Sequence, residues 1–180
     1  AGPRLLAGMS EESSAHAEQF LREMGVNILL NKRVVDYRDH KVVLEDGTEI
    51  ATRTFIWVSG VTGVTIGNLD ASLIGRGGRI KVDSFNRVEG MNNVFAIGDQ
   101  CIQLADENYP NGHPQLAQVA IQQGELLAKN LIRMEKGQEM KPFHYRNLGS
   151  MATVGRNRAV AEFSKVKMQG WFAWVMWLVV

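Results

Sequence analysis

The first 60 residues alternate apolar and polar positions in a way that predicts one helix followed by short strands. Apolar side chains recur at the spacing of one helix face over residues 11–24. Ser10 is placed to cap this helix at its start, and Gly25 is placed to end it. Asp46-Gly47 predicts a hairpin turn. Four apolar runs predict strands: Val26–Leu30, Arg33–Tyr37, Lys41–Leu44 and Thr54–Val58.

A glycine-rich stretch, residues 60–78, interrupts this pattern and predicts a long loop. Its run Gly75-Arg76-Gly77-Gly78 follows no long apolar strand and precedes no helical pattern. Because a phosphate-binding loop needs the N-terminus of a helix, we interpret the run as a turn before a strand.

Strands and one long helix return in the second half of the chain. Pro114 suits the first position of a helix, and apolar positions continue along one face to Met134. The predicted strands of this half are Arg79–Val82, Val94–Ile97, Phe143–Arg146, Ser150–Val154 and Arg158–Phe163. The chain is therefore expected to mix helices and strands.

The composition narrows the class of protein. The 180 residues carry 20 basic and 19 acidic side chains and are 45% hydrophobic, which is typical of a globular protein and argues against a nucleic-acid partner. Cys101 is the single cysteine, so an internal disulfide and a cysteine metal cage are excluded. This cysteine usage fits a reducing compartment.

Basic charge and apolar residues are concentrated near the C-terminus. Residues 1–128 hold 11 basic and 16 acidic groups, a net −5, whereas residues 129–180 hold 9 basic and 3 acidic groups, a net +6. Trp171–Val180 is apolar throughout and about half as long as a bilayer span requires. As a helix, this run places its tryptophans on one face and predicts an anchor lying in one leaflet of a membrane. A core strand or core helix is the alternative.

One constellation carries candidate chemistry: an apolar strand ending in Gly98-Asp99, a loop, and the helix predicted from Pro114. Glycine at the end of a strand lets a ligand approach the backbone, and the next carboxylate can accept hydrogen bonds from sugar hydroxyls. The helix N-terminus offers free N–H groups and partial positive charge. Gln115, Gln118 and Gln122 follow at helical spacing. The plain alternative is an ordinary turn beside a tightly packed helix.

These residues carry a resemblance to a known family. Val94-Phe95-Ala96-Ile97-Gly98-Asp99 resembles the second FAD-binding motif of flavoprotein reductases that have two dinucleotide-binding domains. Trp57-Val58-Ser59-Gly60-Val61 precedes it, and Ala117-Gln118-Val119-Ala120-Ile121-Gln122-Gln123-Gly124 follows it. With these segments, residues 149–156 and the tryptophan-rich end, the chain resembles type II NADH:quinone oxidoreductases over essentially its whole length.

The resemblance implies an α/β fold made from parts of two Rossmann-like dinucleotide-binding domains, with mixed sheets, flanking helices and the start of a membrane-associating region. It assigns residues 1–60 to the NADH-binding domain, 61–140 to the FAD-binding domain and 141–180 to the C-terminal region. The chain contains no G-x-G-x-x-G motif and has no initiator Met. We therefore expect the C-terminal part of a longer enzyme, which alone neither binds FAD tightly nor oxidises NADH.

The resemblance also implies a reaction. NADH would pass a hydride to FAD, and two electrons would go on to a membrane quinone without proton pumping, so no catalytic side chain and no metal is expected. The enzyme would sit peripherally on the cytoplasmic face of the cell membrane, and a homodimer is left open. The implied contacts are Gly98 and Asp99 with the ribityl and phosphate region of FAD, Gln115, Leu116, Ala117 and Gln118 with its ring system, Ser59 and Gly60 with nicotinamide, and Gln118 and Gln122 with quinone.

Other readings stay open from the sequence. A sulfide:quinone reductase would need cysteines in this half of the chain, where only Cys101 occurs, whereas a disulfide reductase keeps its thiol pair in the preceding half. A non-catalytic, membrane-attached interaction module would bind no flavin even in the whole protein. We interpret Cys101 as a small buried residue and His113 as a residue that caps its loop, with proton supply to quinone as the alternative role of His113.

Overall fold

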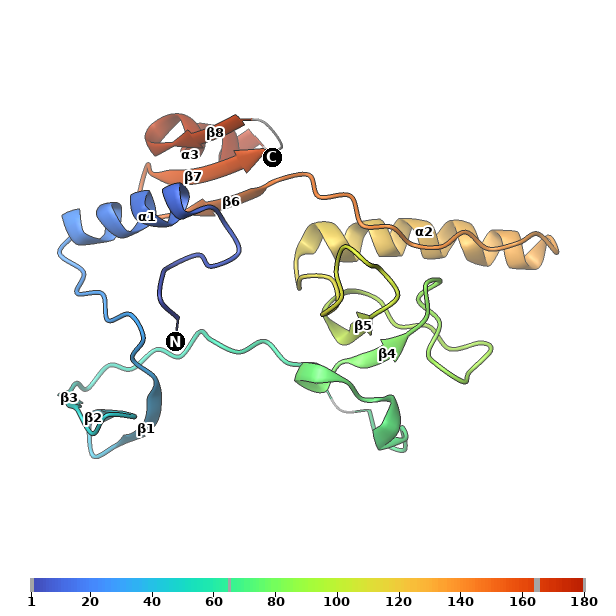
Figure 1. Ribbon diagram of the computed structural model, residues 1–180, viewed down its shortest axis with the longest axis horizontal. Coiled ribbons are helices and arrows are strands. Elements are labelled where there is room, and N and C mark those ends of the chain that lie inside the picture. Colours follow the sequence, from blue (N-terminus) through green and yellow to red (C-terminus); the bar gives the residue numbers. More distant parts are fainter. Residues whose placement is uncertain (1, 65, 164–165, 180) are drawn as a thin grey trace. The chain divides into compact units, whose positions relative to one another are not determined.

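The computed structural model describes residues 2–64, 66–163 and 166–179, which form two compact units (Figure 1). The terminal unit joins Ala1–Trp57 with Leu148–Val180, and the central unit is Val58–Asn147. The elements in chain order are α1 (Glu11–Glu23), β1 (Val34–Arg38), β2 (Lys41–Leu44), β3 (Glu49–Ala51), β4 (Ile80–Val82), the 3-10 turn η3 (Gly98–Gln100), β5 (Cys101–Gln103), α2 (Ala117–Glu135), β6 (Ser150–Thr153), β7 (Ala159–Phe163), β8 (Val166–Gln169) and α3 (Gly170–Val179). Two further 3-10 turns are η1 (Ala71–Leu73) and η2 (Arg76–Gly78).

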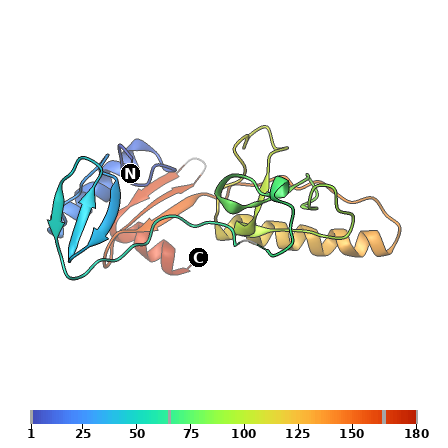
Figure 2. The ribbon, with the colours of Figure 1, turned by 90° about the horizontal axis from the view of Figure 1, so that it is seen from below.

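The antiparallel sheet β6-β7-β8 forms the core of the terminal unit (Figure 2). Successive side chains of a strand point to opposite faces of the sheet. Ala159 and Ala161 of β7 are fully buried with Ala173 of α3, because small side chains let the helix approach closely. Glu162, on the other face of β7, meets the N-terminus of α1. The two helices therefore cover opposite faces of this sheet. A second antiparallel sheet in the same unit has the order β1-β2-β3.

Helix α1 begins where the sequence predicts, and a carboxylate from the sheet fixes its start. Ser10 is the N-cap, and its side chain accepts a hydrogen bond from Ser13 N. Glu162 accepts hydrogen bonds from Ser10 N at 3.0 Å, from Ser13 Oγ at 2.6 Å and from Ser10 Oγ. Burial disfavours the charge on Glu162, but these hydrogen bonds outweigh burial and hold its pKa below the ordinary value. The positive end of the helix dipole adds to this attraction.

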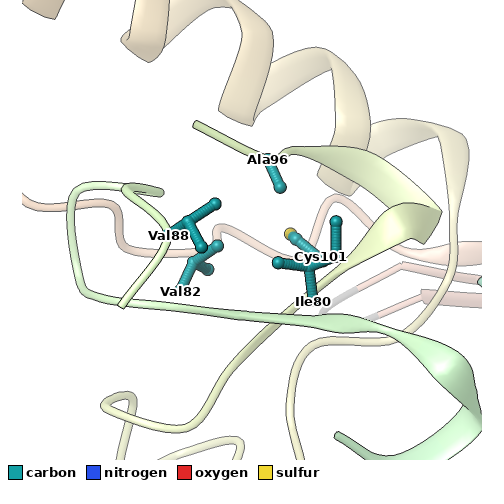
Figure 3. Close-up of a cluster of buried hydrophobic side chains, with 5 residues drawn as sticks. All are labelled: Ile80, Val82, Val88, Ala96 and Cys101. Carbon is teal, nitrogen blue, oxygen red and sulfur yellow. The ribbon is translucent and has the colours of Figure 1, made fainter. Parts of the chain in front are cut away.

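The central unit is built around one parallel pair of strands. β4 pairs with β5 in the register Ile80↔Cys101, Lys81↔Ile102 and Val82↔Gln103. The side chains of Ile80 and Val82 meet those of Val88, Ala96 and Cys101 in a buried cluster (Figure 3). Helix α2 packs over the η3 turn that directly precedes β5. The core of this unit therefore lies beside the Gly98-Asp99 motif.

Most predicted elements are confirmed within one or two residues, among them α1, β1, β2, the hairpin turn at Asp46-Gly47, β4, β6 and β7. The Gly75–Gly78 run is the expected turn before a strand. Residues 171–179 are helical, so a strand is wrong for this run, and the membrane anchor stays a prediction. Val180, the last residue of that prediction, lies outside the described residues. The α/β fold class is confirmed, whereas the division at residues 60 and 140 stays a prediction.

Four predicted strands are wrong in this structure. Three of them form no strand, and the run containing Phe95 makes only one isolated bridge, to Arg87. A strand needs continuous pairing with a neighbouring backbone. Val94–Ile97 has two such hydrogen bonds, from Val88 N to Val94 O and from Ala96 N to Asn86 O, and Phe143 N donates to Ser84 O, but none of the four runs is paired along its length among the described residues. In Thr54–Val58 the side chains of Ile56 and Val58 are exposed by 76% and 90%, whereas Ala96 and Phe143 in the other runs are buried. The runs are Val26–Leu30, Thr54–Val58, Val94–Ile97 and Phe143–Arg146.

The long helix starts three residues later than predicted. Pro114 lies outside α2, because its carbonyl accepts the N–H of Leu116 at 3.0 Å and Leu116 is extended, with φ −132° and ψ 144°. The short strands β3, β5 and β8 show no clear periodicity in the sequence and were not predicted. Within the described part of the chain, no helix is both apolar and long enough to cross a bilayer.

Candidate functional site

The Gly98-Asp99 motif forms a tight turn pressed against α2. Gly98 has φ +65°, a conformation that side chains disfavour. A Cβ built on Gly98 would lie only 3.2 Å from the Cβ of Ala120. Glycine is therefore favoured here both by the backbone angle and by the close approach of the helix. From the sequence, the small side chains of α2 could either leave space for a ligand or allow close packing. In the structure, the small side chain of Ala120 allows close packing against Gly98.

Asp99 and the start of α2 lie together, as the sequence predicts. Gln115 Nε2 donates a hydrogen bond to the carbonyl of Asp99 at 3.2 Å. The side chain of Asp99 is exposed, and Leu116, the N-cap of α2, supplies no side-chain oxygen to the first N–H groups of the helix. Ala117 is the first residue of that helix. An exposed carboxylate thus neighbours a helix N-terminus that no side chain of its own cap satisfies.

Gln123 is a functional candidate that the sequence reading missed. Its side chain is 1% exposed, and its Oε1 accepts a hydrogen bond from Gly98 N at 2.7 Å. Its Nε2 donates to the sulfur of Cys101 at 3.5 Å. The available signal was helical spacing, because Gln123 falls four residues after the buried Val119 and so shares its inward face.

Cys101 is buried, as predicted, with 1% of its surface exposed. Burial raises the pKa of its thiol above the ordinary value, although the hydrogen bond with Gln123 opposes this effect. The thiol donates weakly to the carbonyl of Gly98 at 3.5 Å. Cys101 is therefore a neutral, inward-facing partner of the turn.

Gln118 and Gln122 lie on α2, but their environments differ. Gln118 is partly buried in the first turn of the helix. The amide of Gln122 donates to the carbonyl of Arg146 at 2.9 Å and accepts from its N–H at 3.0 Å. Gln122 thus holds the segment that leaves the central unit, and its amide is occupied by backbone in this structure.

Ser59 and Gly60 are exposed in an extended segment, and no hydrogen bond among the described residues joins them to Asp99 or Gln115. The loop that follows them does reach the turn, because Gln100 exchanges two hydrogen bonds with the backbone of Val64, at 2.9 and 2.5 Å. A pocket of about 370 Å³ lies between these parts. It is lined by Val61, Arg76, Gly77, Arg79, Asn111, Gly112, His113, Pro114 and Gln115.

His113 anchors the loop that leads into α2. Its Nε2 lies 2.9 Å from Asp106 Oδ2, and both side chains are buried. The hydrogen bond with His113 lowers the pKa of Asp106 below its ordinary value. Tyr109, Phe143 and Tyr145 surround the imidazole with ring centroids 5.1 to 5.8 Å away. The loop-capping interpretation fits this geometry, and proton supply by His113 stays a prediction.

Arg79 closes the two ends of the same loop. Its Nε donates to the carbonyl of Cys101 at 2.6 Å, and its Nη2 donates to the carbonyl of His113 at 3.1 Å. The guanidinium thereby links the residue after the η3 turn to the residue before Pro114. Within the described ranges, no group of histidine, cysteine and acidic side chains could hold a metal ion.

Comparison with known proteins places these features in one family. Residues 1–124 match the family model of the pyridine nucleotide-disulphide oxidoreductases. A type II NADH:quinone oxidoreductase of Mycobacterium tuberculosis is 35% identical over 99% of this chain, which covers 39% of that protein. The Plasmodium falciparum NDH2 structure in complex with NADH has a TM-score of 0.84 at 18% identity, covering 99% of this chain and 52% of that one. A sulfide:quinone oxidoreductase of Aquifex aeolicus has a TM-score of 0.74 at 14% identity, covering 99% and 46%.

The two structural similarities, both under 25% identical, describe the fold alone. The chain spans about two fifths of the length of the curated relative it matches. The family model covers more than half of this chain. The chain belongs to the pyridine nucleotide-disulphide oxidoreductase family.

Proposed function

We propose that the chain supplies part of the flavin, nicotinamide and quinone sites of a FAD-dependent NADH:quinone oxidoreductase. The observation that carries this proposal is the hydrogen bond between Gln115 and the carbonyl of Asp99. It brings the residue proposed to hold the ribityl chain beside the residues proposed to meet the flavin ring. The 35% identity to a type II NADH:quinone oxidoreductase along 99% of the chain supports the same activity.

The residues of the η3 turn and α2 fit FAD chemically. The Asp99 carboxylate is exposed and can accept hydrogen bonds from ribityl hydroxyls, while Gly98 carries no side chain that would obstruct the approach. The N–H of Ala117, at the start of α2, has no side-chain cap and favours an electron-rich ring edge. FAD, when bound, supplies the acceptor for a hydride from NADH and the donor of two electrons to quinone.

The protein's own part is to position these groups. Gln118 follows Ala117 on the first turn of α2 and is proposed to face both the flavin ring and the quinone. Gln122 is the second proposed quinone residue, and its bonds to Arg146 imply that it acts by shaping the wall of that site. Ser59 and Gly60 precede Val61 of the 370 Å³ pocket that Gln115 also lines, which supports a nicotinamide site there.

The natural protein that carries this chain provides the test. We expect the purified protein to be yellow, to contain FAD and to oxidise NADH with a short-chain ubiquinone or menaquinone analogue as acceptor. Asp99→Ala should lower the affinity for FAD by about tenfold or more, because a hydrogen-bonding carboxylate contributes roughly 1.5–3 kcal/mol. The 180-residue chain alone should be colourless and inactive. A flavin-free natural protein, or one that oxidises sulfide in place of NADH, contradicts the proposal.

Helix α3 supports a peripheral attachment to membranes. Trp171, Phe172, Trp177 and Leu178 are exposed, from 46% for Trp177 to 68% for Phe172. Tryptophan side chains of this kind favour the boundary between headgroups and acyl chains, and the basic residues after residue 128 favour anionic lipid. The cytoplasmic leaflet and a homodimer belong to the same proposal.

Vesicle flotation tests the membrane part separately. The natural protein should float with vesicles containing phosphatidylglycerol, and the double variant Trp171→Ser, Trp177→Ser should float at least about threefold less. The exposed Ile56→Ser variant is a control from outside the helix. Flotation that is unchanged in the double variant contradicts an anchor at α3.

A further inference from the structure

We propose that Gln123 is a positioning residue for the cofactor, because it locks the Gly98-Asp99 turn to helix α2 from inside the protein. This inference rests on the proposed flavin site and adds to it a residue that does not itself touch the flavin. Its consequence is that two parts of that site, the exposed carboxylate of Asp99 and the start of α2, keep one fixed separation.

The backbone of Gly98 is held at both of its polar groups. Its N–H donates to Gln123 Oε1 at 2.7 Å, and its carbonyl accepts the N–H of Cys101 and, at 3.5 Å, the thiol of the same residue. Gln123 Nε2 in turn donates to the sulfur of Cys101 at 3.5 Å. Gln123 therefore fixes the peptide plane between Ile97 and Gly98, while Cys101 holds the next plane, between Gly98 and Asp99.

The interior around Gln123 explains why this contact is specific. Gln123, Cys101 and Asn86 are each 1% exposed, and Asn86 Nδ2 lies 4.0 Å from the sulfur of Cys101. Buried polar groups are costly unless they are paired, and the amide of Gln123 is paired with Gly98 and Cys101. An apolar side chain of the same length would make neither hydrogen bond. Such a side chain would leave the N–H of Gly98 without an acceptor. The turn would then be free to rotate its peptide plane and to reorient the next residue.

The geometry separates this role from general packing. Packing against Ala120 limits how closely the turn approaches α2, since a Cβ added to Gly98 would lie 3.2 Å from the Cβ of Ala120. This packing does not determine how the peptide groups of the turn are oriented. Gln123 supplies that orientation. The side chain of Asp99 points away from this interior, since it is exposed while Gln123 is buried. A defect at Gln123 should therefore appear at the cofactor more strongly than in the unfolding temperature.

Two substitutions in the natural holoprotein distinguish the possibilities. Gln123→Met keeps the length and removes both polar atoms, whereas Gln123→Glu keeps an acceptor for the N–H of Gly98. Gln138→Ala, at an exposed glutamine outside α2, is the matched control. The measurements are the dissociation constant for FAD after reconstitution of the apoprotein, the flavin midpoint potential, the KM for NADH and the unfolding temperature of the apoprotein.

We expect Gln123→Met to bind FAD about tenfold more weakly and to shift the flavin potential, while Gln123→Glu stays within about threefold of the wild type. Native FAD affinity in Gln123→Met, or equal losses in both folded variants, overturns the inference. If Gln123→Met does not fold, the FAD affinity of Gln123→Glu is the test: an affinity within about threefold of the wild type supports the inference, and a larger loss overturns it. Failure of both to fold assigns Gln123 a purely structural role and also overturns it. A flavin-free wild type overturns the proposed function as well, whereas a flavin-loaded wild type with unaffected variants overturns this inference alone.

Discussion

Replacing Gly98 by alanine tests how the backbone of the turn is matched to α2. Residues other than glycine pay about 1–2 kcal/mol in the left-handed region that Gly98 occupies at φ +65°. The new Cβ would also lie 3.2 Å from the Cβ of Ala120, closer than ordinary contact. Together these effects predict a loss of about 2 kcal/mol, roughly thirtyfold in an equilibrium constant.

Gly137→Ala separates the two contributions. Gly137 has φ +66°, and a Cβ there would meet nothing within 4 Å. Urea unfolding of the 180-residue chain should show about 1 kcal/mol lost for Gly137→Ala and about 1 kcal/mol more for Gly98→Ala. In the natural protein, only Gly98→Ala should weaken FAD binding. Equal losses of stability, or equal FAD affinities, would refute the reasoning.

A double-mutant cycle identifies the contact directly. Ala120→Gly removes the atom that the new Cβ of Gly98→Ala would meet, at a cost of about 1 kcal/mol in helix propensity. If the contact with Ala120 causes the extra loss, the double variant should be more stable than the sum of the single changes predicts, by about 0.5–1 kcal/mol. Strict additivity would assign the whole effect of Gly98→Ala to its backbone angle.

Three further predictions concern titratable groups. Glu162→Gln should reduce the free energy of unfolding by about 1 kcal/mol at pH 7, measured by urea unfolding. Because the pKa of Glu162 is lowered in the folded protein, its contribution to stability is present above its ordinary pKa and is lost as the pH falls. The variant should therefore lose less stability than the wild type between pH 7 and pH 3. Asp106→Asn should reduce the free energy of unfolding by about 1.5–3 kcal/mol at neutral pH. Because the hydrogen bond with His113 lowers the pKa of Asp106, the variant should also lose less stability than the wild type as the pH falls. An equal loss of stability in acid for both proteins would contradict this. Cys101 should react with a thiol reagent at least about tenfold more slowly in the native chain than in urea, and equal rates would show that it is accessible.

Local signals in the sequence were sufficient wherever an element depends on its own residues. The cap at Ser10, the turn at Asp46-Gly47 and the periodicity of α2 are all local, and the structure confirms them. Val26–Leu30 and Thr54–Val58 fail for the opposite reason. Their composition is that of buried strands, but a strand exists only where another backbone lies beside it. The sequence of these runs contains no information on whether such a partner is present.

In the candidate site, too, some residues were predictable from local sequence and others were not. Gly98 and Asp99 were predictable, because glycine followed by a carboxylate at the end of an apolar run is a recognisable combination. Gln123 was overlooked because three neighbouring glutamines on α2 look alike in sequence. The structure shows that Gln123 faces inward to Gly98 while Gln122 faces Arg146. Ala120 lies against the same glycine, so both contacts of α2 with the turn are tertiary interactions.

The discontinuous terminal unit has a consequence for the order in which the chain folds during synthesis. Ser10 and Glu162, which join α1 to β7, are separated by 152 positions in sequence. At roughly 5–20 residues per second, a ribosome needs about 8–30 s to produce the second partner after the first. The central unit, by contrast, is one continuous segment and has all its contacts available once Asn147 has emerged. Helix α1 must wait for its sheet through that interval, so chaperone binding to the nascent chain should concentrate on residues 11–30.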